Sequence, residues 1–390
     1  MEGILRHLRR DIFEVFIYVV LPKDAKDEFF ASIKAHADSI VHLPHNVLLS
    51  KRTILDDDLD VLVFPEISMD PLTYLLAHFR LARKQAVWWG HPETTGIPTI
   101  DYFISMDVEI TGASAHYTER LYKLKGIGTY YADPADALSY DMLNHTHAKL
   151  KLIAEIIRND DSKSDAEMLS NIRIYTCAQS LFKLHPEHFD IAVAKILASD
   201  PHAHIVLFRG RIAQWTENVL RRLGENIARQ SFNSGEDQSS NKMNRVHFIR
   251  RRQHTGFLNV LLGSDVVLDT HPFGGGVSNL EAFSVGTPVI THPDVYLRGR
   301  LTLAFYREMR LGSRFVRYDI SEYAQLAIET ANYPTDELRR LIYDRKKLLF
   351  SNRRAVEEWE RFFIFACQTL NLKSLHGIMN KYIQEPKRNF

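Results

Sequence analysis

Cysteine is scarce in this chain of 390 residues, since only Cys177 and Cys367 are present. Two cysteines so far apart in the sequence exclude a disulfide framework and a zinc ribbon, which both need several closely spaced cysteines. The scarcity favours a reducing compartment. We therefore expect the protein in the cytoplasm, with the nucleus as the alternative.

An excess of charge of one sign is also missing. Lys and Arg together number 49 and Asp and Glu number 48, which gives a formal net charge of +1. This balance argues against nucleic acid or an acidic membrane surface as a partner. The apolar run at residues 15–21 is too short to span a membrane and is typical of a buried strand, not of a signal peptide.

Metal-binding patterns are absent as well. No Asp-x-Asp pair follows an expected strand, and the three aspartates at residues 56–58 precede one, which is typical of a solvated turn. We therefore expect neither a metal ion nor another cofactor. No internal repeat is visible, so no helical-repeat array is expected within this chain.

The sequence does contain a regular alternation of short apolar runs and helical periods, which predicts an α/β fold with doubly wound, mainly parallel sheets in two Rossmann-like halves. A charged stretch at residues 142–161 predicts a linker that ends near residue 165, and we divide the chain into residues 1–165 and 166–390. The polar segment 231–241 predicts a surface insertion. Strands are expected at residues 13–21, 40–43, 61–64, 85–89, 102–104, 172–175, 205–208 and 246–249 and from residues 266 and 289; helices are expected near residues 25–37, 71–81, 189–198, 213–223, 335–350 and 355–370.

The most informative segment is residues 266–291. An apolar β-branched run is followed by three consecutive glycines, which permit a tight turn and close approach of a ligand, and Ser278 and Asn279 are suited to cap a helix. A helix that begins there directs free backbone N–H groups at an anion. Glu281 lies in its first turn, where a carboxylate can accept hydrogen bonds from a sugar diol. The pattern predicts a phosphate site, with a plain turn as the alternative.

This segment resembles the nucleotide-sugar-binding segment of glycosyltransferase family 41, the family of the O-GlcNAc transferases. Residues 85–102 are similar to the family's pattern of Gln, an aromatic residue, Gly, Pro, Thr and Gly followed by Asp-Tyr. Residues 179–186 resemble its Leu-aromatic-Lys element, and residues 116–121 match a connecting piece. The four motifs occur in the family's order. The resemblance implies the GT-B architecture, with two facing Rossmann-like domains and a UDP-sugar, by family UDP-GlcNAc, held by the C-terminal domain.

The resemblance also implies which residues bind the donor. Lys183 corresponds to the family's phosphate-contacting lysine, and Gln179 is expected at the sugar or phosphate. Glu281 takes the ribose hydroxyls where many relatives carry Asp, and His254 and Phe257 stand where relatives use Lys and His around the uracil and ribose. Phe257 can stack on a base or belong to the core. The turn and its backbone amides are expected at the diphosphate, at Gly274, Gly275, Gly276, Val277 and Ser278.

Two histidines and Lys183 are the candidates for catalysis. His271 follows the expected strand at its carboxyl end, a common position for active-site residues in doubly wound folds, and we expect it near the phosphates. His91 lies in the loop of the N-terminal half that the resemblance assigns to the acceptor side. Its imidazole can act as a general base near neutral pH, and a loop histidine without a role in proton transfer is the alternative.

These observations predict an inverting, metal-independent glycosyltransferase that moves GlcNAc or another hexose from a UDP-sugar to Ser or Thr hydroxyls of a protein. Relatives precede this region with a first strand and a His-Pro loop, and many also carry tetratricopeptide repeats. This chain begins after them, so we expect donor binding to be retained better than catalysis. The alternatives are a catalytically impaired UDP-sugar-binding or interaction module and a protein N-glucosyltransferase. The sequence leaves the sugar, the acceptor and the oligomeric state open.

Overall fold

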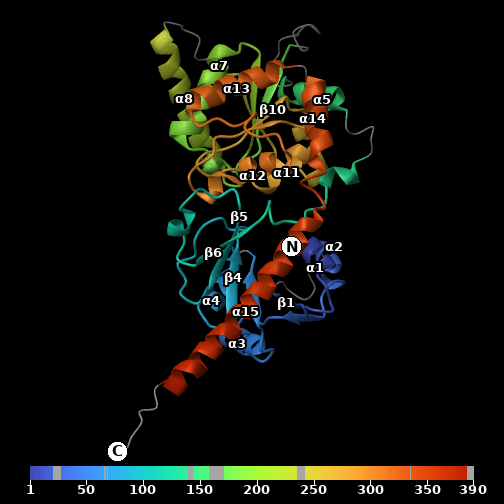
Figure 1. The fold of residues 1–390 in the computed structure, drawn as a ribbon. Coiled ribbons are helices and arrows are strands. Elements are labelled where there is room, and N and C mark those ends of the chain that lie inside the picture. Colours follow the sequence, from blue (N-terminus) through green and yellow to red (C-terminus); the bar gives the residue numbers. More distant parts are fainter. Residues whose placement is uncertain are drawn as a thin grey trace, which may run out of the picture. The chain divides into compact units, whose positions relative to one another are not determined.

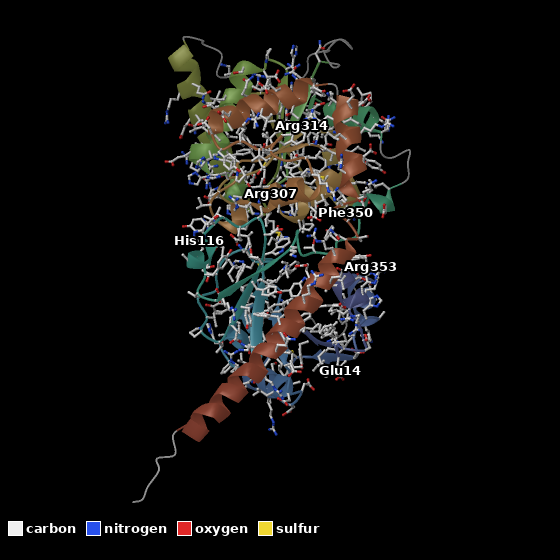
Figure 2. All side chains as sticks on the ribbon, viewed as in Figure 1. Glu14, His116, Arg307, Arg314, Phe350 and Arg353 are labelled. Carbon is white, nitrogen blue, oxygen red and sulfur yellow. The ribbon has the colours of Figure 1, made fainter. Side chains whose placement is uncertain are left out.

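The computed structural model describes residues 1–20, 28–65, 67, 69–138, 144–157, 171–234, 242–333 and 335–383. The chain divides into two compact units: unit 1 contains Met1–Tyr131 and Asn352–Phe390, and unit 2 contains Ala132–Ser351. Side chains fill the interior of each unit (Figure 2). No described helix is long and apolar enough to cross a membrane.

Unit 1 contains two parallel sheets. Its larger sheet has four strands in sequential order, and every residue of the two central strands, β4 and β5, is buried (Figure 1). Burial on both faces explains why apolar residues follow one another in these strands, as at residues 86–88 and 102–104, and do not alternate with polar ones. The larger sheet consists of β3 (Val61–Phe64), β4 (Lys84–Trp88), β5 (Tyr102–Met106) and β6 (Arg120–Leu124), the smaller of β1 (Phe16–Val19) and β2 (Ser39–His42), and the helices are α1 (Glu2–His7), α2 (Glu28–Lys34), α3 (Val47–Leu55) and α4 (Pro71–Ala77).

The last helix, α15 (Arg353–Ile383), packs on unit 1 through aromatic side chains. Trp359 is fully buried, and its Nε1 donates a hydrogen bond of 2.9 Å to the carbonyl oxygen of Gly128. The Phe362 ring lies 5.6 Å from that of Tyr102 and 5.0 Å from that of Tyr122. This packing explains why the end of the chain belongs to unit 1, whereas we had assigned it to the C-terminal domain.

Unit 2 contains one parallel sheet of five strands in the order β11-β10-β7-β8-β9. The first strand of the unit, β7, lies in the middle: β8 and β9 follow on one side, and β10 and β11 follow on the other. The strand order therefore reverses between β7 and β10. The strands are β7 (Arg173–Cys177), β8 (Ala203–Phe208), β9 (Val246–Ile249), β10 (Val266–Leu268) and β11 (Val289–Ile290).

Helices α7, α8 and α13 lie around this sheet, and α5 and α14 lie elsewhere in the unit (Figure 1). Helix α5 packs against α10 and buries Leu152, Ile153 and Ile156, so the unit begins before the boundary that we expected at residue 165. The helices are α5 (His145–Ile157), α7 (Ile191–Ser199), α8 (Ala213–Ser234), α10 (His254–Gly263), α11 (Val277–Ser284), α12 (Leu301–Glu308), α13 (Ile320–Asn332) and α14 (Thr335–Lys346).

The predicted α/β fold class is confirmed, and each expected strand has a counterpart in the structure. The sequence interpretation missed β6, a strand with only one buried residue, and several helices, among them α3, α10, α12 and α13. The C-terminal end of the expected linker, residues 158–165, lies outside the described residues. Residues 235–241 of the expected insertion also lie outside them, and its residues 231–234 belong to α8.

Candidate functional site

The candidate site lies in unit 2, where the strand order reverses between β7 and β10. In doubly wound sheets, ligands bind beyond the carboxyl ends of the strands at this point. The segment after β7 contributes Gln179 and Lys183, and the segment after β10 contributes Asp269 and the glycine turn. The fold thus brings together two motifs that are about ninety residues apart in the sequence.

A buried carboxylate holds the glycine turn. Asp269 is 4% exposed, and its Oδ1 accepts hydrogen bonds from the amides of Gly275, at 2.7 Å, and Thr270, at 3.0 Å. Its Oδ2 accepts from the hydroxyls of Thr291, at 2.8 Å, and Thr302, at 2.7 Å. Four donors satisfy the buried charge, which would otherwise be costly. We assigned no role to Asp269 from the sequence, although its position directly after a buried strand was a usable signal.

Helix α11 begins two to three residues earlier than expected, because its N-cap is Gly276 and not Ser278 or Asn279. The Gly275 amide is bound by Asp269, which corrects our expectation that it is available to a phosphate. The amides of Val277 and Ser278 occupy the first helical turn, where no intrahelical acceptor exists. The helix therefore offers these donors, together with its positive dipole end, to an anion.

Gln179 connects the two motifs. Its side chain is 7% exposed, and Nε2 donates to Ser278 Oγ at 2.5 Å and to Asn279 Oδ1 at 3.5 Å. Asn279 is fully buried, and its Nδ2 donates to Thr302 Oγ1 at 2.7 Å and to the Gly275 carbonyl at 3.3 Å. Gln179 is thus a structural link to the first turn of α11 as well as a candidate ligand residue.

Lys183 points at the same turn. Its Nζ donates to the Gly274 carbonyl at 3.1 Å and to Gln179 Oε1 at 3.2 Å, and it lies 3.8 Å from the centroid of the Phe273 ring. Desolvation lowers the pKa of Lys183, and the nearby Asp269 charge opposes this shift. The ammonium is therefore held at the glycine turn in a partly desolvated setting, where it can strengthen the attraction of an anion.

Glu281 and His254 form a pair at the start of α10. His254 Nε2 lies 2.8 Å from Glu281 Oε1, and the side chains are 56% and 11% exposed, respectively. Desolvation raises the pKa of Glu281, while the contact with His254 opposes the rise. Both residues were predicted to bind the donor. The structure brings them together and leaves the outer face of the imidazole open to solvent.

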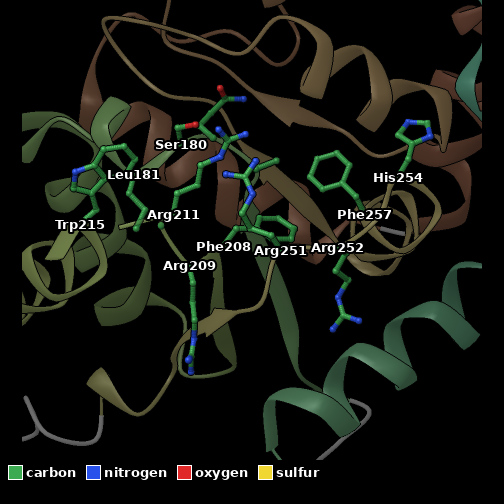
Figure 3. Close-up of a pocket in the computed structure, with 13 residues that line it drawn as sticks. Ser180, Leu181, Phe208, Arg209, Arg211, Trp215, Arg251, Arg252, His254 and Phe257 are labelled. Atoms are coloured by element: carbon green, nitrogen blue, oxygen red, sulfur yellow. The ribbon is translucent and has the colours of Figure 1, made fainter. Parts of the chain in front are cut away.

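A cavity of about 290 Å³ adjoins these residues (Figure 3). Phe257 lines it, and its ring lies 5.4 Å from that of Phe208, while it also packs against the core cluster around β7 and β8. The contact of Phe257 with the core is thus observed, and its stacking on a base stays a prediction. The lining residues are Ala178, Gln179, Ser180, Leu181, Phe208, Arg209, Gly210, Arg211, Trp215, Arg251, Arg252, His254 and Phe257.

His271 lies in a cluster of three imidazoles. Its ring is stacked 4.2 Å from that of His292 and lies 4.2 Å from that of His188, and its Nδ1 is 3.0 Å from the His292 carbonyl oxygen. Desolvation, together with the neighbouring histidines, lowers the pKa of His292 to about 4. Desolvation and the neighbouring histidines also lower the pKa of His188. The expected role of His271 near a phosphate stays a prediction.

His91 belongs to unit 1, in the loop after β4. A buried carboxylate orders this loop: Glu119 Oε1 accepts from the Thr95 amide at 2.8 Å, and Oε2 accepts from Thr94 Oγ1 at 2.7 Å. Desolvation alone would raise the pKa of Glu119, but the hydrogen bonds from Thr95 and Thr94 outweigh it and lower the pKa. The role of His91 as a general base stays a prediction. Among the described residues of both units, no group of His, Cys, Asp or Glu could hold a metal ion.

Comparisons with known proteins agree with the expected resemblance. A probable UDP-N-acetylglucosamine–peptide N-acetylglucosaminyltransferase, SPINDLY, from Petunia hybrida is 23% identical over 270 residues, which cover 65% of this chain and 24% of the relative. A UDP-glucose:protein N-beta-glucosyltransferase from Actinobacillus pleuropneumoniae is 22% identical over 290 residues, which cover 74% of this chain and 41% of the relative. The chain thus spans less than half the length of these relatives. No family model matches.

The fold comparison points the same way. A solved structure of an O-GlcNAc transferase mutant from Thermobaculum terrenum superposes with a TM-score of 0.73 at 21% identity, covering 95% of this chain and 65% of that one. At this identity the likeness establishes the fold, which is that of a GT-B glycosyltransferase. The predicted resemblance to O-GlcNAc transferase-like proteins is thereby confirmed.

Proposed function

We propose that this chain is a glycosyltransferase of family 41 type that moves GlcNAc or another hexose from a UDP-sugar to Ser or Thr hydroxyls of a protein. One observation carries the proposal: Lys183 lies at the glycine turn before α11, at the switch point of unit 2. The adjoining cavity is lined by Gln179 and His254, which contact Ser278 and Glu281 of the same helix. These groups complement the diphosphate and the ribose of a nucleotide sugar.

The chemistry that follows is an inverting displacement without a metal. The acceptor oxygen attacks the anomeric carbon, the bond from this carbon to the diphosphate oxygen breaks, and UDP leaves with the electron pair. Negative charge grows on the diphosphate, so a fixed cation and helix N-terminal amides stabilise the transition state more than the ground state. The acceptor proton passes to a general base, for which His91 is the candidate.

The names of the relatives support a second acceptor. Two relatives in Actinobacillus pleuropneumoniae are UDP-glucose:protein N-beta-glucosyltransferases, at 22% and 21% identity. Transfer of glucose to Asn is therefore the alternative reaction at the same donor site. In either case the partner is a protein or peptide acceptor. We place the reaction in the cytoplasm or the nucleus, where both cysteines stay reduced.

A donor-binding module without turnover is the second candidate function. It is favoured by Lys183, whose ammonium already donates to the Gly274 carbonyl and to Gln179 and can therefore serve to hold the turn. Such a module would bind UDP and its sugars but would not release UDP.

Calorimetric titration with UDP in the presence of EDTA tests donor binding. A UDP-release assay with UDP-GlcNAc and with UDP-glucose on the same sample then tests turnover, with Ser/Thr peptides and Asn peptides as separate acceptors. Binding with release supports the transferase and ranks donors and acceptors. Binding without release supports the module, and the absence of binding by UDP contradicts both.

A further inference from the structure

Four arginines line the cavity of unit 2, and they differ in what their guanidinium groups contact. Arg252 forms an ion pair with Glu155 on α5, and Arg209 donates from Nε to the Phe248 carbonyl at 3.1 Å. Arg211 and Arg251 have no hydrogen-bond or ion-pair partner among the residues that the structure describes. The cavity therefore has two engaged and two free guanidinium groups.

Figure 3 shows that the two free groups point toward each other. In this view the side chains of Arg211 and Arg251 extend toward Ser180, whereas the side chains of Arg209 and Arg252 extend away from them. Like charges that converge without a carboxylate repel each other, and an anion placed between them relieves this repulsion. The arrangement is that of a site prepared for an anion.

The charge of the expected donor indicates which anion fits. A nucleotide sugar carries about two negative charges on its diphosphate, and Lys183 with the α11 N-terminus supplies about one and a half positive charges. The leaving diphosphate gains a further negative charge as the glycosidic bond breaks. Gln179 lines the cavity and also contacts Ser278 in the first turn of α11, so the free arginines and the helix N-terminus border connected parts of one site.

We propose that Arg211 and Arg251 form a cationic clamp for the diphosphate of the nucleoside-diphosphate donor, in addition to Lys183 and the amides of α11. This inference rests on the proposed function for the identity of the donor. The clamp would stabilise the negative charge that develops on the leaving diphosphate. Neither the sequence pattern nor the relatives give Arg211 and Arg251 this role.

The test compares two pairs of matched variants. Arg211→Gln and Arg251→Gln remove the free guanidinium groups, and Arg209→Gln and Arg252→Gln remove the engaged ones from the rim of the same cavity. Because Arg211 and Arg251 are exposed and form no hydrogen bond or ion pair with the described residues, both variants should keep the wild-type melting temperature. Each protein is titrated with UDP, uridine and inorganic pyrophosphate by calorimetry in EDTA.

We expect Arg211→Gln and Arg251→Gln each to weaken UDP and pyrophosphate binding about tenfold, as for the loss of a charge-assisted hydrogen bond, and to leave uridine binding unchanged. The controls should change UDP affinity by less than about twofold. If UDP binds all four variants alike, or if uridine binding falls in parallel, the clamp is refuted while the proposed function stands. If pyrophosphate affinity falls in Arg211→Gln and Arg251→Gln but UDP does not bind the wild type, the clamp stands and the proposed donor is wrong. Binding of neither UDP nor pyrophosphate to the wild type refutes both.

Discussion

The Asp269 carboxylate accepts a hydrogen bond of 2.7 Å from the amide of Gly275, and this contact fixes the glycine turn that precedes α11. The same carboxylate accepts from Thr291 and Thr302, which come from β11's end and from α12. One buried side chain thus ties the turn to two further elements. The shape of the candidate phosphate site depends on a residue that need not touch the ligand.

Replacement of Asp269 by Asn should destabilise unit 2 and weaken donor binding. An amide offers only one acceptor oxygen, so at least one buried donor loses its partner at a cost of about 1–3 kcal/mol. We expect the melting temperature to fall by about 3 °C or more and UDP affinity to fall with it. Differential scanning calorimetry and a UDP titration measure both. Thr302→Val is the milder control, because it removes one of the four donors and leaves the charge.

Two adjacent glycines should differ sharply in their tolerance of a methyl group. A Cβ at Gly275 would lie 2.2 Å from Gln179 Nε2 and 2.5 Å from Asn279 Oδ1, whereas at Gly276 its nearest contact is Leu301 Cδ1 at 3.5 Å. Gly275→Ala therefore displaces the link between the two motifs, at a cost of about 1–3 kcal/mol. We expect weakened UDP binding for Gly275→Ala and near wild-type binding for Gly276→Ala. Equal affinities would show that the link is dispensable.

The inner strands β8 and β10 of the sheet in unit 2 could be predicted because they are almost entirely buried and appear in the sequence as apolar runs between turns. Strand β6 was missed because only its last residue is buried, and its charged side chains hide the pattern. The domain boundaries were displaced because they depend on the packing of α5 and α15, which no local pattern encodes.

The candidate site was predictable where a motif is local and unpredictable where contacts are distant. The glycine turn, Lys183 and Glu281 follow from adjacent residues and from the family resemblance. The contact of Gln179 with Ser278 joins residues 99 positions apart, and the pairing of His254 with Glu281 joins residues 27 positions apart. The sequence could not distinguish Arg211 and Arg251 from Arg209 and Arg252, because the contacts of Arg252 with Glu155 and of Arg209 with Phe248 are known only from the structure.

Lys183→Ala should weaken UDP binding by about 1.5–3 kcal/mol if the ammonium makes a charge-assisted bond to phosphate. The contact between Nζ and the Gly274 carbonyl, at 3.1 Å, places this cation at the turn. Lys195, whose Nζ donates to Ser321 on the exposed side of unit 2, provides the control Lys195→Ala. Isothermal titration calorimetry compares the two. An unchanged affinity in Lys183→Ala removes Lys183 from the donor site.

Acid should destabilise unit 2 through the imidazole cluster. The folded-state pKa of His292 is about 4, below the ordinary value of 6.5, because burial and the rings of His271 and His188 disfavour the imidazolium. The unfolded chain therefore binds more protons between these two values, so stability is lost as the pH falls from about 6.5 to 4. We expect the melting temperature to fall over this range, and to fall less in His292→Gln. Identical pH profiles would exclude His292 as the source.

Donor binding should depend on the contact between His254 and Glu281. Burial raises the pKa of Glu281, and the His254 contact at 2.8 Å opposes this rise, so loss of the imidazole should raise the Glu281 pKa further. A protonated carboxyl accepts hydrogen bonds from ribose hydroxyls less well. His254→Gln should therefore lose UDP affinity at a higher pH than the wild type as the solution is acidified, and Glu281→Gln should bind weakly with a flatter profile. Titrations between pH 5 and 8 measure the midpoints. The control is His204→Asn, which alters the separate histidine pair with His247. An acid midpoint that does not move in His254→Gln would show that the imidazole does not affect the pKa of the Glu281 carboxylate.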